Sequence, residues 1–224
     1  MRMCHTAITS GRPSCGETSM NLYAHWLLPR LIDLAMRNPQ ATRQRQAMVP
    51  AACGRVLELG AGSGLNLPYY GAGVTELYAL DPSAQLLAMA RGKRAGAGFP
   101  VTFLPCSAEA IPLASGSVDT VVSTWTLCSI ADALRALGEA RRVLAPGGTL
   151  IFVEHGLAPD AGVRRWQRRL NPLWRRIAGG CNLDRSVDGL VRAAGFEITD
   201  LHAEYLQGPR PFTYTYSGRA RRGA

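Results

Sequence analysis

The chain has 224 residues, 47% of them hydrophobic and 18% charged, and a formal net charge of +9 at pH 7. This length and composition fit one α/β domain with an ordinary globular core, and no apolar run approaches the roughly 18 residues that span a bilayer. Residues 1–20 are polar and lack the apolar segment of a secretory signal. We therefore expect a mobile polar leader over residues 1–20, a single domain over residues 21–224 and a cytoplasmic location.

The six cysteines are scattered, without a C-x-x-C pair or a paired cysteine and histidine spacing. This pattern argues against a zinc site and against a disulfide framework, so we expect no metal. Cys128 and Cys181 are interpreted as buried packing residues, with a redox or metalloid-binding role as the alternative.

Positive charge is concentrated in the last part of the chain, where twelve arginines and five acidic residues follow residue 160. A solvated, arginine-rich surface explains this excess, and contact with an anionic membrane or a nucleic acid is the alternative. No separate nucleic-acid module is visible, so we expect no nucleic-acid partner. The pattern predicts no particular oligomeric state.

Along the chain, residues 21–36 carry apolar side chains at roughly helical spacing, interrupted by Pro29. A polar stretch follows over residues 37–46, and short apolar runs then alternate with helical segments. Strands are predicted at residues 55–59, 76–80, 101–104, 120–123, 149–154, 197–205 and 211–217.

Helices are predicted between these strands from their end signals. Ser83 and Asp132 are suitable N-caps, and Gly195 is a suitable C-cap for a helix around residues 187–194. Alternating strands and helices predict an α/β fold, a mostly parallel seven-stranded sheet with helices on both faces. Ligands bind such sheets beyond the carboxyl ends of the strands.

Residues 163–177 combine six arginines with apolar side chains near helical spacing, although Pro172 breaks the pattern. We interpret residues 161–180 as a lid over a bound ligand or as a segment that lies on a membrane surface, with its tryptophans at headgroup level. A charged surface helix is the alternative.

The segment Val56–Gly64 is a buried strand that runs into a loop with glycine at every second position. Glycine lets the backbone bend sharply and approach a ligand closely. Asp81 ends the next strand, where a carboxylate can accept hydrogen bonds from ribose hydroxyls. The loop therefore predicts a nucleoside-containing ligand.

Two residues indicate which kind of nucleoside-containing ligand the loop binds. A dinucleotide fingerprint requires a third glycine at position 65, which is Leu65, and Glu58 lies two residues before the loop. A carboxylate there repels a pyrophosphate but attracts a sulfonium cation with an amino-acid tail. The loop thus favours S-adenosylmethionine (SAM) over a nicotinamide dinucleotide.

Further segments resemble the class I SAM-dependent methyltransferases, namely Asp81–Ser83, Ala108–Leu113 and Arg141–Gly148. The resemblance covers residues 50–155 and implies a Rossmann-like fold with SAM as the cofactor. Ser107 stands where many relatives have an aspartate that contacts the adenine amino group. The resemblance and the loop together predict cofactor contacts at Glu58, Gly60, Ala61, Gly62, Gly64, Asn66, Asp81, Pro82, Ser83, Ser107, Ala108, Glu109 and Thr124.

A narrower resemblance is carried by Thr124–Ser129, Glu154–His155 and Gly179–Arg185, which look like the alkyl thiol methyltransferases of the methyltransferase-like group. It implies a related acceptor pocket. His155, at the end of the fifth predicted strand, is the candidate catalytic base, and Trp125 is a candidate for the pocket wall. A hydrogen-bonded core histidine and a packing tryptophan are the alternatives.

A thiol acceptor needs little activation, because a free thiol is already partly ionised at neutral pH. We therefore predict methylation of a small, fairly apolar molecule, with a thiol as the favoured acceptor. Methylation of a membrane lipid, such as a phospholipid amine or a quinone, is the alternative and would bring peripheral contact with an anionic membrane. A non-catalytic SAM-binding sensor is the third interpretation.

Overall fold

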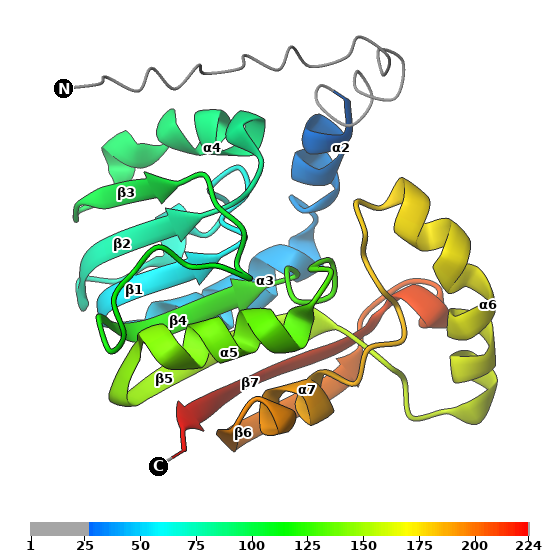
Figure 1. The fold of residues 1–224 in the computed structure, drawn as a ribbon. Coiled ribbons are helices and arrows are strands. Elements are labelled where there is room, and N and C mark those ends of the chain that lie inside the picture. Colours follow the sequence, from blue (N-terminus) through cyan, green and yellow to red (C-terminus); the bar gives the residue numbers. More distant parts are fainter. Residues whose placement is uncertain (1–26, 224) are drawn as a thin grey trace, which may run out of the picture.

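Seven strands form one sheet in the computed structural model, which describes residues 27–223 (Figure 1). The sheet order is β3-β2-β1-β4-β5-β7-β6; β7 runs antiparallel to both of its neighbours, and the other pairs are parallel. The predicted mostly parallel sheet is confirmed, and the predicted leader lies outside the described residues. The strands are β1 (Gly54–Leu59), β2 (Val74–Leu80), β3 (Val101–Leu104), β4 (Val118–Thr124), β5 (Leu144–His155), β6 (Phe196–Tyr205) and β7 (Tyr214–Arg222).

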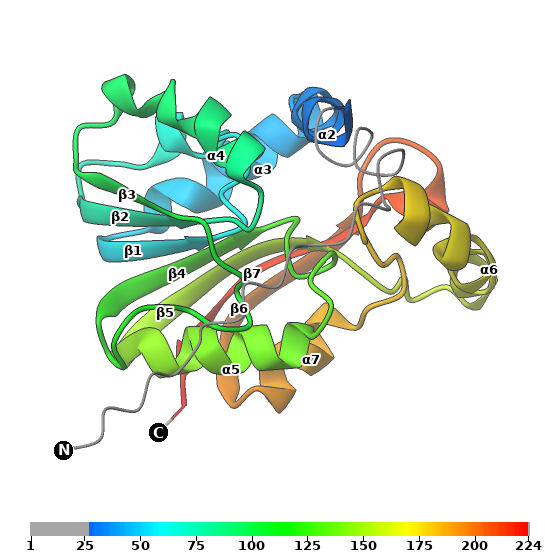
Figure 2. The same cartoon turned by 45° about the horizontal axis from the view of Figure 1, so that its top comes forward.

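Helices cover both faces of the sheet, as predicted: α5 and α7 lie on one face, and α3 and α4 lie on the other (Figures 1 and 2). No helix within residues 27–223 has the length and apolar character needed to cross a bilayer. The α-helices are α2 (Leu28–Ala35), α3 (Pro39–Met48), α4 (Ala84–Arg91), α5 (Ala133–Val143), α6 (Ala161–Ile177) and α7 (Val187–Ala193). Short 3₁₀ helices lie at Val49–Ala51, Leu67–Tyr69, Arg94–Gly96 and Arg210–Phe212.

The central strands are buried on both sides, because successive side chains of a strand point to opposite faces. On β1, Leu57 belongs to the core that includes Leu137 of α5, whereas its neighbour Val56 belongs to a second core that includes Leu87 of α4. All four side chains are fully buried. The two cores fix the sheet between its two helical layers.

The order of the strands reverses between β1 and β4, since β2 and β3 extend the sheet on one side and β4 and β5 on the other. At such a point the connections on the two sides diverge and leave a crevice beyond the carboxyl ends of the strands. Helices α2 and α6 both lie at this end of the sheet (Figures 1 and 2). The topology therefore positions the ligand site.

The three predicted helix caps are confirmed. Ser83 Oγ accepts a hydrogen bond from Leu86 N at 3.3 Å, and Asp132 Oδ1 accepts one from Arg135 N at 3.0 Å. Gly195 follows α7 with a φ of +81°, the left-handed conformation that glycine adopts without strain.

The first part of the described chain forms two helices. Helix α2 begins at Leu28, with Pro29 in its first turn, where the missing N–H has no helical partner to lose, and the predicted pattern before residue 27 lies outside the described residues. The polar stretch that follows is the helix α3. Asn38 Oδ1 accepts a hydrogen bond from Ala41 N at 2.9 Å. The start of this helix is therefore specified by its N-cap, since its sequence has no periodic pattern of apolar residues.

Two predictions for the last part of the chain are wrong. Pro172 does not break α6, because its ring lies on the exposed face, where the carbonyl that loses its partner can be solvated. The last strand begins at Tyr214 and not at residue 211, since the prolines at 209 and 211 belong to the turn around Arg210–Phe212.

The buried face of α5 generates a stability prediction. Leu137 is fully buried, whereas Leu134, one turn earlier on the same helix, is 45% exposed. We expect Leu137→Ala to lower the free energy of unfolding by about 2–5 kcal/mol, and Leu134→Ala by less than about 0.5 kcal/mol. Urea denaturation followed by circular dichroism measures both values, and equal losses would contradict this placement of the helix.

Candidate functional site

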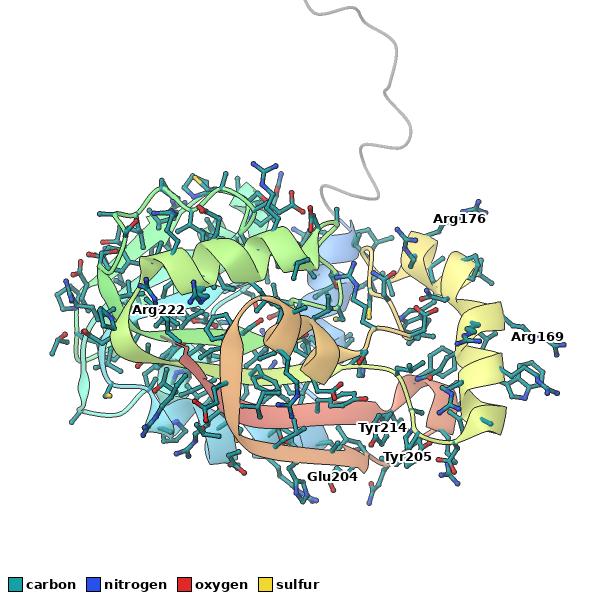
Figure 3. All side chains as sticks on the ribbon, turned by 60° about the horizontal axis from the view of Figure 1, so that its bottom comes forward. Arg169, Arg176, Glu204, Tyr205, Tyr214 and Arg222 are labelled. Carbon is teal, nitrogen blue, oxygen red and sulfur yellow. The ribbon has the colours of Figure 1, made fainter. Side chains whose placement is uncertain are left out.

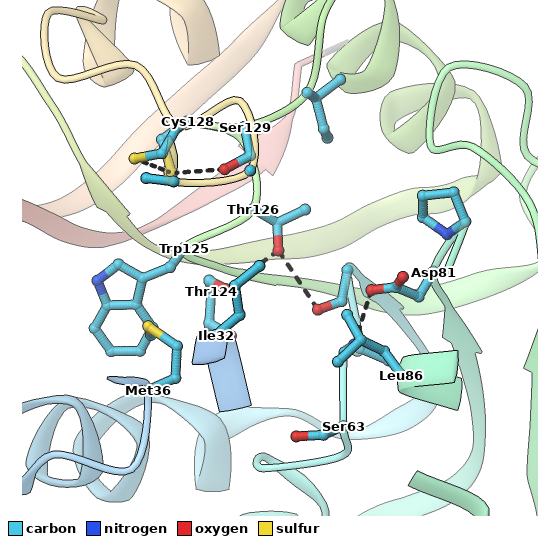
Figure 4. Close-up of a pocket in the computed structure, with 18 of the residues that line it drawn as sticks. Ile32, Met36, Ser63, Asp81, Leu86, Thr124, Trp125, Thr126, Cys128 and Ser129 are labelled. Carbon is cyan, nitrogen blue, oxygen red and sulfur yellow. Dashed lines mark hydrogen bonds between the residues drawn. The ribbon is translucent and has the colours of Figure 1, made fainter. Parts of the chain in front are cut away.

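A cavity of about 660 Å³ lies in the crevice beyond the carboxyl ends of β1 and β4 (Figure 4). Its wall is built from the loop after β1, the end of β2, the turn after β4, helix α2 and the last turn of α6. Most of the wall is apolar, with a few polar groups between. This size and lining are those of a small-molecule site.

The loop after β1 requires its glycines. Gly60, Gly62 and Gly64 have φ values of +64°, +54° and +75°, which side chains rarely adopt. A Cβ at residue 60 would also overlap the Thr126 side chain, and one at residue 64 would lie 2.8 Å from Leu67 Cδ1. Gly60 thus lets the loop pack against the turn after β4, and Gly64 lets it pack against Leu67 and Ala90.

Asp81 joins the end of β2 to this loop. Its Oδ2 accepts a hydrogen bond from Gly62 N at 2.9 Å, and its Oδ1 accepts one from Ser83 N at 2.8 Å. Burial raises the pKa of this carboxyl, although the two N–H groups oppose the rise. Each oxygen keeps a further lone pair, so Asp81 can accept two more hydrogen bonds from a ligand.

Glu58, at the end of β1, is fully buried in the wall. Asn66 Nδ2 donates to its Oε1 at 2.7 Å, and the Tyr70 hydroxyl donates to its Oε2 at 3.0 Å. Burial raises the pKa of Glu58 to about 7, against the lowering effects of these two hydrogen bonds and of the Arg45 charge. The carboxyl therefore changes its charge near neutral pH.

Most of the predicted cofactor residues line the cavity. Gly64 and Ser83 are the two that do not, because the first packs against Leu67 and the second caps α4. The two catalytic candidates, His155 and Trp125, also line the cavity. The other eleven predicted cofactor residues line it too: Glu58, Gly60, Ala61, Gly62, Asn66, Asp81, Pro82, Ser107, Ala108, Glu109 and Thr124.

Helix α2 contributes a wall that the sequence did not predict. Asp33 of this helix lines the cavity and accepts a short hydrogen bond from Ser63 Oγ, and it forms ion pairs with Arg37 and Lys93 at 2.7 and 3.7 Å. Burial opposes ionisation of Asp33, but these partners together lower its pKa. The sequence signal that could have predicted this wall is Asp33 itself, a single acidic residue among the apolar positions of α2. Four apolar residues of α2 and one that follows it complete this wall: Leu28, Leu31, Ile32, Ala35 and Met36.

The turn after β4 is held by a buried carboxylate. Glu154 Oε1 accepts hydrogen bonds from Ser123 Oγ at 2.7 Å and from Thr126 N and Leu127 N at 3.0 Å, and its Oε2 accepts one from Cys128 N at 3.3 Å. Burial raises the pKa of Glu154 despite these donors. The turn is fixed in place as a result.

Trp125 adopts a φ of +51° in this turn, the left-handed region that tryptophan rarely enters. Its backbone N–H donates to Val153 O at 2.7 Å, and the Arg45 guanidinium lies 5.0 Å from the centre of its indole ring. Figure 4 shows the indole in the same wall as Ile32 and Met36. Backbone strain of this kind is concentrated at functional sites.

Two cysteines and one histidine meet in the same wall. Cys128, His155 and Cys181 each line the cavity, and one ligand atom from each lies within 4.8 Å of the others. The two sulfur atoms are 3.6 Å apart, and the Cys181 sulfur lies 3.8 Å from His155 Nδ1. The hydrogen bond between the thiols, together with His155 and Trp174, lowers the pKa of Cys181, and the same bond raises that of Cys128. Spacings of 27 and 26 residues hid this cluster in the sequence.

Helix α6 turns a polar face inward, while its outward face carries both arginines and apolar side chains. Gln167 bonds the backbone of Gly156 and Ala158, and Asn171 bonds Asp184 and the backbone of Leu183. Arg169 and Arg176 project away from the sheet (Figure 3). Three apolar side chains of this helix are more than half exposed: Trp166, Leu173 and Ile177.

Comparison with known proteins supplies an independent line of evidence. The chain matches the model of a methyltransferase domain over residues 57–152. Thiol S-methyltransferases of Rattus norvegicus and Homo sapiens are both 32% identical to it, over 71% and 72% of this chain. The matches cover 65% and 69% of those proteins, so the chain spans about two thirds of their length. A demethylmenaquinone methyltransferase of Thermus thermophilus is 35% identical over 57% of this chain and 59% of that protein.

The fold is also found in solved structures. A SAM-dependent methyltransferase from Mesorhizobium loti superposes with a TM-score of 0.61 at 22% identity, over 85% of this chain and 100% of the other. At this identity the similarity supports the fold.

The buried Glu58 generates a pH prediction. Its pKa of about 7 in the folded state lies above the ordinary 4.5, so its stabilising contribution is complete below pH 4.5 and is lost as the pH rises through 7. Glu58→Gln cannot ionise. Between pH 4 and 8, we expect the unfolding free energy of the wild type to fall relative to that of the variant by about 3 kcal/mol.

Chemical denaturation at several pH values measures this difference, and the exposed Glu197→Gln serves as the control. A difference between wild type and Glu58→Gln that stays constant from pH 4 to 8 would contradict the raised pKa.

Proposed function

The chain belongs to the SAM-dependent methyltransferases, and we propose that it transfers the methyl group of SAM to the sulfur of a small, fairly apolar thiol. The choice of a thiol as the acceptor rests on the cavity wall beside the turn after β4, where apolar side chains surround two thiols and one imidazole. The similarity to thiol S-methyltransferases supports the same choice.

On the cofactor side, we propose that Asp81 accepts hydrogen bonds from the ribose hydroxyls and that the loop Gly60–Gly64 approaches the methionine part. The free lone pairs of Asp81 and the close backbone of the loop support this placement. SAM carries a sulfonium and an ammonium group, and Glu58 supplies opposite charge near the loop when it is ionised. Ser107, Ala108 and Glu109 then lie on the adenine side.

On the acceptor side, the chemistry of the wall favours a thiol. Asp33 is already paired with Arg37 and Lys93, so it is a poor base. His155, the candidate base from the sequence, lies in the wall with its Nδ1 3.8 Å from the Cys181 sulfur. An alcohol or a protonated amine needs a positioned base, whereas a thiol supplies its own thiolate. Methyl transfer then depends mainly on holding sulfur and methyl group in line. In this account Trp125 and the apolar residues of α2 position the acceptor.

A membrane acceptor, such as a quinone, is the second candidate, and a specific observation favours it. Leu31 of α2 and Ile177 of α6 both line the cavity and are 44% and 51% exposed, so the mouth of the cavity is apolar. Arginines of α6 lie beside it and would attract anionic headgroups. The similarity to a demethylmenaquinone methyltransferase is consistent with this alternative.

The cofactor assignment predicts the effect of Asp81→Asn. An amide cannot replace both charge-assisted acceptors, so SAM should bind more weakly by about 1.5–3 kcal/mol. Isothermal titration calorimetry measures this change, with the exposed Asp200→Asn as the control. Unchanged affinity in Asp81→Asn, with the fold intact by circular dichroism, would contradict the ribose contact.

The acceptor assignment predicts the products of turnover. With methyl-labelled SAM and a panel of apolar thiols, amines, alcohols and quinones, we expect labelled thioethers, formed faster as the pH rises toward the pKa of the acceptor thiol. Mass spectrometry identifies the products. Each reaction is run with and without anionic vesicles. Methylation of quinones or lipids alone, and only with vesicles, would contradict the thiol assignment and support the membrane candidate.

A further inference from the structure

The cluster of Cys128, His155 and Cys181 has the composition and dimensions of a metal site. A tetrahedral zinc ion holds sulfur at about 2.3 Å and nitrogen at about 2.0–2.1 Å, so its ligand atoms lie about 3.8 Å apart for two sulfurs and about 3.6 Å apart for sulfur and nitrogen. The observed separations are 3.6 Å between the sulfurs and 3.8 Å between the Cys181 sulfur and His155 Nδ1. The ligand atoms of Cys128 and His155 lie within 4.8 Å of each other, so this third pair would close by at most about 1 Å around an ion.

The backbone around the cluster is fixed without any bond between the thiols. Asn182 N and Asn182 Nδ2 both donate to Cys128 O at 2.8 Å, and Asn182 Nδ2 also donates to Gly180 O at 3.0 Å. Gly180 has a φ of +87°, and a Cβ there would lie 3.0 Å from Ser129 O. The segment with Cys181 is thus pressed against the turn with Cys128, so the two sulfurs are held in place.

The cluster leaves room for one more ligand. All three side chains line the cavity, so the fourth position of a tetrahedral ion would face the cavity. Zinc sites with three protein ligands and an open fourth position are those that act on substrates, whereas structural sites use four protein ligands. Two thiolates and an imidazole are soft ligands that suit zinc over magnesium or calcium.

We propose that Cys128, His155 and Cys181 bind one Zn²⁺ ion, and that the sulfur of the acceptor occupies its fourth position. The second half of this proposal rests on the proposed thiol function; the metal site does not. The two cysteine thiolates neutralise the ion, and the half-buried guanidinium of Arg185, which donates to Leu127 O, compensates nearby negative charge.

The reaction at this site is a simple displacement. The acceptor thiol loses its proton to solvent when its sulfur bonds the metal, as coordinated thiols do. The bound thiolate attacks the methyl carbon of SAM; the new carbon–sulfur bond forms, the sulfonium carbon–sulfur bond breaks, and its electron pair stays on the sulfur of S-adenosylhomocysteine. The thioether is neutral and a weaker ligand, so it leaves the metal.

Cobalt titration tests the metal site. The full-length protein is reduced, freed of metal with a chelator and titrated with Co²⁺. We expect one equivalent to bind, with thiolate-to-cobalt charge-transfer absorption and the visible bands of a tetrahedral ion, and Zn²⁺ to displace it. Cys128→Ser and Cys181→Ser should each abolish the charge-transfer spectrum or lower the affinity by at least about 100-fold. The control variants replace the other four cysteines, Cys4→Ser, Cys15→Ser, Cys53→Ser and Cys106→Ser, and should leave the spectrum unchanged.

Two results would overturn the metal site: reduced, folded protein that shows no tetrahedral cobalt spectrum, or a spectrum that survives both Cys128→Ser and Cys181→Ser. A Cys128–Cys181 disulfide in oxidised protein, together with no cobalt binding after reduction, would identify a redox pair and also overturn it. Circular dichroism of each variant separates loss of the ligand from loss of the fold.

Methyl transfer to a thiol by the metal-free and the Zn²⁺-loaded protein separates this proposal from the function on which it rests. Faster transfer by the loaded protein, by at least about tenfold, supports a metal-bound acceptor. Equal rates would refute the proposal that the acceptor sulfur binds the metal, and would leave the proposed thiol methylation unaffected. Metal binding with no thiol methylation in either form would refute the thiol function and the acceptor half, while the metal site would stand on the cobalt spectrum.

Discussion

The site depends on one buried carboxylate. Glu154, on β5, receives four hydrogen bonds from β4 and the turn that follows it, three of them from consecutive backbone N–H groups. Buried N–H groups without partners are costly, so this carboxylate decides the path of the turn. Burial in turn makes Glu154 harder to ionise, a cost that its four donors offset.

The same turn connects the two halves of the cavity. On one side, the Thr126 side chain fills the space that a Cβ at Gly60 would occupy, so the turn and the cofactor loop fit only when residue 60 is glycine. On the other side, the turn carries Cys128 to His155, the neighbour of Glu154 on β5, and to Cys181. One interaction therefore sets the distance between the proposed cofactor contacts and the thiol and imidazole cluster.

Features encoded by neighbouring residues could be predicted from the sequence, and features that depend on distant segments could not. The strands, the caps at Ser83 and Asp132, and the glycine loop with Asp81 all follow from short patterns. The cluster at Cys128 and Cys181 brings together segments that no spacing rule connects. The wall from α2 and the polar inward face of α6 depend on hydrogen bonds to remote groups. Helix α3 was not predicted because its sequence lacks apolar residues at helical spacing, although its N-cap residue, Asn38, is present.

The cofactor loop and the Cys128, His155 and Cys181 cluster line the same cavity, and we infer that they face each other across it. A crystal structure with S-adenosylhomocysteine tests this arrangement. We expect the ribose hydroxyls to bind Asp81 and the cofactor sulfur, which carries the methyl group in SAM, to face the cluster. A cofactor bound elsewhere, or one whose sulfur points away from the cluster, would refute the arrangement.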